Sequence, residues 1–224
     1  MAEPLNRNQM AWRAAQDIED GMVVNLGMGM PVLAANYAPA GREVIFQSEN
    51  GIIGCGPEAS ENERDPDLVD ASSRFVTLAV GGSIIDSVGA FAMIRGGHVD
   101  VTMLGGFEVS AKGDLANWDM QVPNKGQLVG GAMDLAYGAG EVRVIMQHVT
   151  RSGGPRLLNE CRLPLTGPAC VTRIYTDLAV VDVTDKGFVV REILPGLTAE
   201  ELQAKTEAPL AFADDCKPME TPAL

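Results

Sequence analysis

Met22-Val-Val-Asn-Leu-Gly-Met-Gly-Met-Pro31 is the stretch of sequence that decides the fold. Its first half, Met22 to Leu26, is apolar enough to predict a buried strand. Gly27-Met-Gly29-Met-Pro31 then predicts a tight turn into a helix. Pro31 suits the first helical position because its fixed φ is already helical and its missing N–H has no partner there. Strand, turn and helix in this order indicate a layered α/β protein.

The same alternation continues on both sides of this stretch. Upstream, residues 8–20 place apolar side chains on one face of a helix that we expect to stop at Gly21. We therefore expect an α/β fold with three layers, α/β/α, around a mostly parallel open sheet. The other expected elements are strands at 44–47, 76–80, 99–104, 142–148, 178–183 and 188–193, helices at 84–94 and 132–137, and a last helix that begins with the capping box Thr198 and Glu201.

We expect one domain. The 224 residues can bury a proper core together, whereas two halves would each be marginal. Residues 1–210 should form this domain, and residues 211–224 should be a frayed C-terminal tail. Residues 105–131 form a long glycine-rich loop, and a loop of that length inside a compact domain is commonly functional.

Charge and composition exclude several classes of partner. The net charge of −13 argues against a nucleic acid or an anionic membrane. No apolar run approaches the roughly 20 residues that span a bilayer, and the N-terminus lacks the apolar stretch of a signal peptide. The cysteines lack metal-binding spacing, so we expect free thiols, a cytoplasmic location and no metal site. They are Cys55, Cys161, Cys170 and Cys216.

An anionic ligand would need a local surplus of cations in so acidic a chain. One stretch has it, with only Glu160 as an acid, although we expect most of its arginines to be scattered over the surface. These arginines are Arg143, Arg151, Arg156, Arg162 and Arg173. The two histidines, His98 and His148, have no triad or metal context, and we expect both to be structural.

Three short segments could carry chemistry, although each has a simpler explanation. Gly27-x-Gly29 is half of a dinucleotide-binding fingerprint, but Val32 replaces the third glycine, which favours a plain turn. Ser48-Glu49-Asn50-Gly51 predicts a turn that holds a carboxylate beyond a strand, where α/β sheets place ligands. Most such tetrapeptides are only turns. Gly130-Gly131 could offer N–H donors to an oxyanion, or could equally be a packing turn.

Seven segments in a fixed order resemble the B subunit of the class I CoA-transferases, over about residues 9–209. They are Asn25-Leu-Gly-Met-Gly-Met-Pro31, Ser48-Glu-Asn-Gly51, Ala92-Met-Ile-Arg-Gly-Gly-His-Val-Asp100, Lys112-Gly-Asp-Leu-Ala-Asn-Trp118, Gly130-Gly-Ala-Met-Asp-Leu135, Leu163-Pro-Leu-Thr-Gly167 and Arg173-Ile-Tyr-Thr-Asp-Leu-Ala-Val180. The resemblance implies a fold shared with small sugar-phosphate isomerases. It also implies an active site between this chain and a separate A subunit, in an A2B2 assembly or, as the alternative, a single AB pair.

The resemblance also implies roles for two residues. Glu49 would be the nucleophile, and the backbone N–H of Gly131 would help to bind the oxyanion, with the second donor supplied by the A subunit. CoA and acyl-CoA would be substrates, and no cofactor would be bound permanently. Weaker candidates for contacts with substrate or CoA are Gly27, Gly29, Asn50, Gly51, Gly130 and Lys125.

The family reaction moves CoA from succinyl-CoA to a 3-oxoacid through a glutamyl-CoA thioester, by ping-pong catalysis. Within the family, several segments look more similar to the 3-oxoadipate branch, which serves aromatic catabolism, than to the acetoacetate branch. They are Gly81-Gly-Ser83, Ala34-Ala-Asn-Tyr37, Cys170-Val-Thr-Arg-Ile-Tyr175 and Asp119-Met-Gln-Val-Pro-Asn-Lys125, which departs from the common, shorter pattern after Trp118. Acetoacetate or another short 3-oxoacid is the alternative acceptor.

A 3-oxoadipate site must hold a second carboxylate, which needs a cation if it is desolvated. The candidates are Arg95, Lys112 and Lys125, of which Lys125 lies in the departing loop. Two other classes of function stay open. A sugar-phosphate isomerase would use Glu49 as a base and would work without CoA, whereas a non-catalytic acyl-CoA-binding protein would not need the Glu49 carboxylate.

Overall fold

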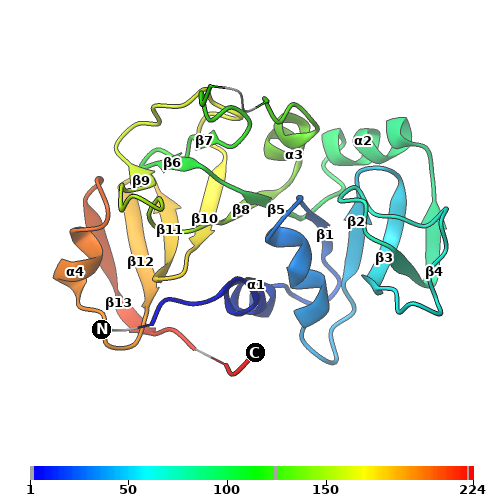
Figure 1. Ribbon diagram of the computed structural model, residues 1–224, viewed down its shortest axis with the longest axis horizontal. Coiled ribbons are helices and arrows are strands. Elements are labelled where there is room, and N and C mark those ends of the chain that lie inside the picture. Colours follow the sequence, from blue (N-terminus) through cyan, green and yellow to red (C-terminus); the bar gives the residue numbers. More distant parts are fainter. Residues whose placement is uncertain (1–2, 124–125, 221) are drawn as a thin grey trace.

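The computed structural model describes residues 3–123, 126–220 and 222–224, and its centre is a large open sheet (Figure 1). Within these residues the sheet has ten strands. They are β1 (Val23–Leu26), β2 (Ile45–Ser48), β3 (Ile52–Glu58), β4 (Val76–Ile84), β5 (Val101–Gly105), β8 (Glu141–Ile145), β10 (Val171–Tyr175), β11 (Ala179–Thr184), β12 (Gly187–Ile193) and β13 (Leu210–Pro218).

The strand order contains a topological switch point, where connections from neighbouring strands lead to opposite sides of the sheet. The order is β13-β12-β11-β10-β8-β5-β1-β2-β3-β4. The five strands from β10 to β2 are parallel, whereas most pairs in the two flanks are antiparallel. From β1 the chain continues to β2 on one side, and from β5 it continues to β8 on the other. Crevices for ligands form at such switch points, outside the carboxyl ends of the strands.

Helices cover both faces of the sheet (Figure 1). On one face α1 (Arg7–Gln16) packs against the short 3-10 helix η1 (Pro31–Tyr37), and on the other α2 (Ser87–Arg95) packs against α3 (Ala132–Gly138). A small sheet lies on the same side as α3, and α4 (Ala199–Gln203) precedes β13. The expected α/β fold with a mostly parallel open sheet is confirmed. The small sheet consists of β6 (Glu108–Ser110), β7 (Leu115–Ala116) and β9 (Leu157–Leu158).

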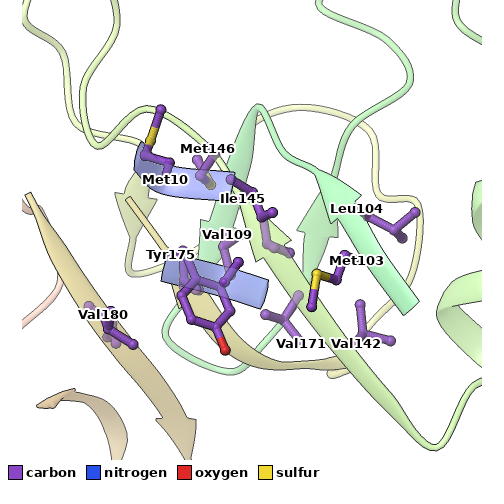
Figure 2. Close-up of a cluster of buried hydrophobic side chains, with 14 of the residues drawn as sticks. Met10, Met103, Leu104, Val109, Val142, Ile145, Met146, Val171, Tyr175 and Val180 are labelled. Atoms are coloured by element: carbon purple, nitrogen blue, oxygen red, sulfur yellow. The ribbon is translucent and has the colours of Figure 1, made fainter. Parts of the chain in front are cut away.

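The core lies between the parallel strands and these layers. Strands β5 and β8 are buried almost throughout, as their continuous apolar runs require when both faces of a sheet are covered. Figure 2 shows Met10 of α1 gathered with side chains from the sheet, including Met103, Ile145 and Tyr175. A buried ion pair joins α1 to β12 at the edge of this core. Arg13 Nε donates a hydrogen bond to Glu192 Oε2 over 2.7 Å.

Several helices and strands lie where the local sequence patterns predicted them. Strand β1 passes through the predicted turn into η1, with Pro31 at its first position. The capping box at Thr198 opens α4 as expected. Several boundaries differ. Helix α1 ends at Gln16 rather than near Asp20, α2 begins at Ser87 rather than at residue 84, and β8 ends at Ile145 rather than at residue 148. The Asp86 side chain accepts a hydrogen bond from the Gly89 N–H and thereby caps α2, while β4 continues to Ile84.

The prediction that residues 211–224 are a frayed tail is wrong for most of that segment. Residues 210–218 form β13, which pairs in parallel with β12 and closes one edge of the sheet. The side chain of Met219 beyond it is 2% exposed. Most of β13 faces solvent, so its residues lack the apolar periodicity that would reveal a strand. Pairing with β12 over a long crossover decides its structure.

Candidate active site

A cleft of about 900 Å³ opens at the carboxyl edge of the parallel strands, at the switch point between β1 and β5. Gly27 lines it from the end of β1, and Gly105 and Gly106 line it from the end of β5. Two loops complete it, the glycine-rich segment that ends at Gly131 and the segment from Thr150 to Arg156. Residues 105–131, expected to be one long loop, contain the short strands β6 and β7, and parts of this segment border the cleft.

The turn between β2 and β3 places Glu49 in this cleft. Gly51 N–H donates to the Ser48 carbonyl over 2.9 Å, which closes the turn around Glu49 and Asn50. Gly51 has a φ of +121°, and a Cβ there would lie only 2.0 Å from the carbonyl oxygen of Ile85. Glycine is therefore required at this position. The Asn50 amide donates to the Val69 carbonyl over 2.7 Å and fixes the outer side of the turn.

Burial perturbs the Glu49 carboxylate. The side chain is half-buried among the apolar walls of the cleft, and this desolvation raises the pKa of Glu49 above its ordinary value. Within residues 3–123, 126–220 and 222–224, it makes neither a hydrogen bond nor an ion pair. A desolvated carboxylate without a partner is costly, and such groups gather at functional sites.

Gly131 lies directly beside Glu49. A Cβ added at Gly131 would come within 3.5 Å of Glu49 Oε1 and within 2.6 Å of the Phe91 ring. Any larger residue would therefore collide with Phe91 of α2. Gly131 is also the N-cap of α3, where no side-chain capping hydrogen bond forms among the described residues. The fold thus brings together two residues that are far apart in sequence, a carboxylate and an N-terminal backbone segment of a helix.

The weaker candidates from the sequence divide into two groups. Gly27 and Gly130 line the cleft with Glu49 and Gly131. Gly29, Asn50 and Gly51 do not line it. Gly29 has a φ of +93°, which the tight turn before η1 requires, and the other two hold the Glu49 turn. Lys125 lies outside the described residues.

The cleft is cationic although the protein is strongly acidic. Among the described residues that line it, Arg7, Arg151 and Arg156 carry positive charge and Glu49 carries the negative charge. The other three arginines of the basic stretch pair elsewhere: Arg143 with Glu141, Arg162 with Glu207, and Arg173 with Asp17 and Asp182. The cleft can therefore attract an anionic ligand despite the net charge of −13.

Two of the predicted cations are elsewhere. Arg95 pairs with Asp134 over 2.7 Å and Lys112 with Glu160 over 3.3 Å, and neither lines the cleft. Sequence reasoning did not single out Arg7, because the N-terminus approaches the cleft only in the folded chain. Arg151 and Arg156 were marked by the scarcity of acidic residues around them.

The described residues offer little for other chemistries. No group of three or more His, Cys, Asp or Glu in them could hold a metal ion, and no helix there is long and apolar enough to cross a membrane. All four cysteines are free and half-buried. His148 is fully buried between the hydroxyls of Thr176 and Thr206, and burial lowers its pKa to about 4. It is a neutral structural residue.

Comparisons with known proteins agree on one family. The model of the family described as Coenzyme A transferase matches residues 7–205. The B subunit of 3-oxoadipate CoA-transferase from Pseudomonas putida is 49% identical over 210 residues, covering 94% of this chain and 98% of that one. The B subunit of a probable succinyl-CoA:3-ketoacid coenzyme A transferase from Bacillus subtilis is also 49% identical, over 92% of this chain and 95% of that one. Among solved structures, the acyl-CoA transferase YdiF from Escherichia coli O157:H7 shares the fold with a TM-score of 0.75 at 20% identity, covering 98% of this chain and 44% of that one.

Proposed function

The chain belongs to the coenzyme A transferase family, and from this membership we propose that it is the B subunit of an enzyme that moves CoA from succinyl-CoA to a 3-oxoacid. The main observation behind the proposal is the environment of the Glu49 carboxylate. It is half-buried, has no partner among the described residues, and lies beside Gly131 in a cationic cleft. We assign Glu49 as the nucleophile and the Gly131 N–H as a donor to the oxyanion.

The first half of the reaction transfers CoA to the protein. A Glu49 oxygen attacks the thioester carbonyl of succinyl-CoA, the C–S bond breaks, and a succinyl-glutamyl anhydride and CoA thiolate result. The thiolate then attacks the glutamyl carbonyl carbon, the C–O bond of the anhydride breaks, and succinate leaves. Glu49 now carries CoA as a thioester, so the energy of the thioester bond is kept.

The second half runs these steps in reverse with another acid. A carboxylate oxygen of the 3-oxoacid attacks the glutamyl thioester and expels CoA thiolate, which gives a new anhydride. The thiolate attacks the acyl carbonyl of the 3-oxoacid, and Glu49 returns as a free carboxylate. Each step exchanges one acyl bond for another, so no oxidant, metal or water enters.

The site compensates for the weak nucleophilicity of a carboxylate. The rigid turn around Gly51 holds Glu49 at one place in the cleft, which lowers the entropy cost of attack. Burial removes water from the carboxylate, and the nearby Gly131 N–H can stabilise charge on the attacked carbonyl. Water must stay away from the thioester, because hydrolysis would discard its free energy.

For the acceptor we favour 3-oxoadipate, the acid in the name of the Pseudomonas relative. The cationic cleft supports this choice, because 3-oxoadipate carries two carboxylates. Acetoacetate or another short 3-oxoacid is the second candidate, since the Bacillus relative of equal identity is named for 3-ketoacids. We further propose a role in aromatic catabolism and a cytoplasmic location.

We propose a separate A subunit as the partner, because the similar bacterial proteins are named as B subunits. The YdiF chain is more than twice as long as this one, since this chain covers 44% of it. The cleft would be completed by the A subunit, which would supply a second oxyanion donor and part of the CoA site. We expect an A2B2 assembly, with CoA and acyl-CoA as transient ligands.

Trapping the thioester tests the role of Glu49. The assembled enzyme is incubated with succinyl-CoA, reduced with borohydride and digested, and its peptides are mapped by mass spectrometry. We expect the reduced glutamate at Glu49 and at no other residue. Glu49→Ala should show no label and no turnover, and Glu49→Asp should be nearly inactive because its shorter side chain misplaces the attacking oxygen.

Glu58→Gln, which changes an exposed glutamate of β3, is the matched control and should react like the wild type. Labelling at another residue, or turnover by the Glu49→Ala enzyme, would contradict the assignment. Activity on a sugar phosphate without CoA would favour an isomerase instead. Binding of acyl-CoA without any label would favour a non-catalytic protein.

A further inference from the structure

Backbone and side-chain hydrogen bonds hold Arg156 in place in the lining of the cleft. Its backbone N–H donates to the His148 carbonyl over 3.2 Å, and its carbonyl accepts from the Val109 N–H over 3.0 Å, just before β9 begins. Its side chain reaches the end of β5, where Nη1 donates to the Gly106 carbonyl over 3.3 Å. Residue 106 is closely packed, because a Cβ there would lie only 2.8 Å from the Val144 side chain.

Arg156 is unusual among the buried and half-buried arginines of this protein, because it forms no ion pair within the described residues. The other half-buried or buried arginines all form ion pairs: Arg13, Arg74, Arg143 and Arg173. Within the described residues Arg156 has no ion pair, and its buried Nε has no acceptor. The negative charges of Glu108 and Asp177 act on Arg156, but neither carboxylate forms an ion pair with it. Both carboxylates accept hydrogen bonds from backbone N–H groups.

We propose that Arg156 binds the carboxylate at the far end of a dicarboxylic acid substrate and thereby selects it over a monocarboxylic one. This inference rests on the function proposed above. A desolvated guanidinium without a counterion is costly, and an incoming carboxylate removes that cost by forming charge-assisted hydrogen bonds. Arg156 and Glu49 both line the same cleft. One acid could therefore meet both, with its reacting end at Glu49.

A phosphate of CoA is the other anion that could meet this cation. The phosphates of CoA lie at the opposite end of the long pantetheine arm from the reacting sulfur. Arg156 is half-buried beside Gly106, at the end of the central strand β5, which favours an anion on the short acid. Arg151 lines the same cleft but is exposed, so it is suited to the outer end of CoA. It therefore serves as the matched control.

The test compares two acceptors that differ only at the far end. 3-Oxohexanoate has the same chain as 3-oxoadipate, with a methyl group in place of the second carboxylate. In ping-pong kinetics, kcat/KM for an acceptor reports only its own half-reaction, so the donor does not affect the comparison. The assembled enzyme is measured as wild type and with Arg156→Gln, Arg156→Lys or Arg151→Gln.

The wild type should prefer 3-oxoadipate, and Arg156→Gln should lower kcat/KM for 3-oxoadipate by about 100-fold, because a charge-assisted hydrogen bond is lost. The same variant should change kcat/KM for 3-oxohexanoate only a few-fold, which also shows that it folds. Arg156→Lys should keep part of the preference, and Arg151→Gln should leave the ratio of the two acceptors unchanged.

Each other result overturns the inference in a recognisable way. Equal losses for both acceptors would assign Arg156 to CoA or to structure. A wild type without preference for 3-oxoadipate would remove the dicarboxylic acceptor while leaving the transferase intact. Failure of the wild type to form the Glu49 thioester would instead contradict the proposed function itself.

Discussion

Glu49 shows how a single residue can trade stability for reactivity. Burial raises the pKa of Glu49, and no cation pairs with it among the described residues. Its ionised form, which the proposed attack requires, is therefore the form that the folded protein disfavours. Active sites commonly contain destabilising groups of this kind, because function requires them.

The destabilisation caused by ionised Glu49 should appear in the pH dependence of protein stability. A raised pKa in the folded state means that the protein binds the Glu49 proton more tightly than the unfolded chain does. The stabilisation is present at low pH and is lost as pH rises through the folded pKa. We therefore expect Glu49→Gln to raise the unfolding temperature of the purified chain at pH 7.

The gain from Glu49→Gln should shrink as pH falls below the folded pKa, where Glu49 itself is protonated. Calorimetry of both proteins across this range measures it. Glu58→Gln, on the exposed part of β3, should show no comparable gain. A Glu49→Gln protein that is less stable than the wild type at pH 7 would show that the carboxylate has a stabilising partner after all.

At the scale of elements, strand β13 protects the edge of the large sheet. It pairs in parallel with β12, and the Met219 N–H donates to the Ile193 carbonyl over 2.8 Å at its end. The buried Met219 side chain anchors this segment against the core. Without β13, the backbone of β12 would be an open edge that other chains could pair with.

Changes at β13 should therefore affect stability and aggregation. We expect Met219→Ala to lower the free energy of unfolding by about 2 kcal/mol or more, because it empties a buried site. Ending the chain after Pro209 should cost more and should cause aggregation. Ending it after Glu220, which keeps β13 and Met219, is the control. Denaturant unfolding and light scattering measure both effects, and wild-type behaviour after loss of residues 210–224 would contradict the structural role of β13.

At the scale of the whole molecule, the chain presents large apolar side chains near its cleft and along one sheet edge. Tyr137 of α3 is 92% exposed, and Val129 beside Gly131 is 76% exposed. Val80 of the edge strand β4 is fully exposed, and Val88 of α2 is 76% exposed. Exposed apolar surface of this kind marks sites of protein association, which fits the proposed A subunit.

We accordingly expect the purified chain to be inactive alone. Mixing it with the A subunit should restore turnover of succinyl-CoA with 3-oxoadipate, and the mass of the complex should correspond to A2B2. The Glu49→Gln chain is the control, since it should assemble with the A subunit and remain inactive. Turnover by the chain alone, at a rate that the A subunit does not change, would show that the site is complete without a partner.

The sequence alone was sufficient wherever the signal is local. Apolar runs and punctuation by glycine and proline located β1, its turn into η1, the Glu49 turn and the α4 cap, because these depend on backbone conformation within a few residues. Resemblance to a family, carried by ordered motifs, then indicated Glu49 and Gly131 together. Neither residue was distinctive by itself.

Tertiary structure decided what depends on distant segments. Strand β13 exists because it pairs with β12, although its own residues mostly face solvent and show no period. Among the described residues, the cations of the cleft are Arg7, Arg151 and Arg156, whereas Arg95 and Lys112 pair with Asp134 and Glu160 outside it. The spacing of charges along a chain does not record which of them lack a counterion after folding. That depends on the burial and pairing of side chains that the fold brings together. For this reason Arg156 could be distinguished from the other arginines of the basic stretch only in three dimensions.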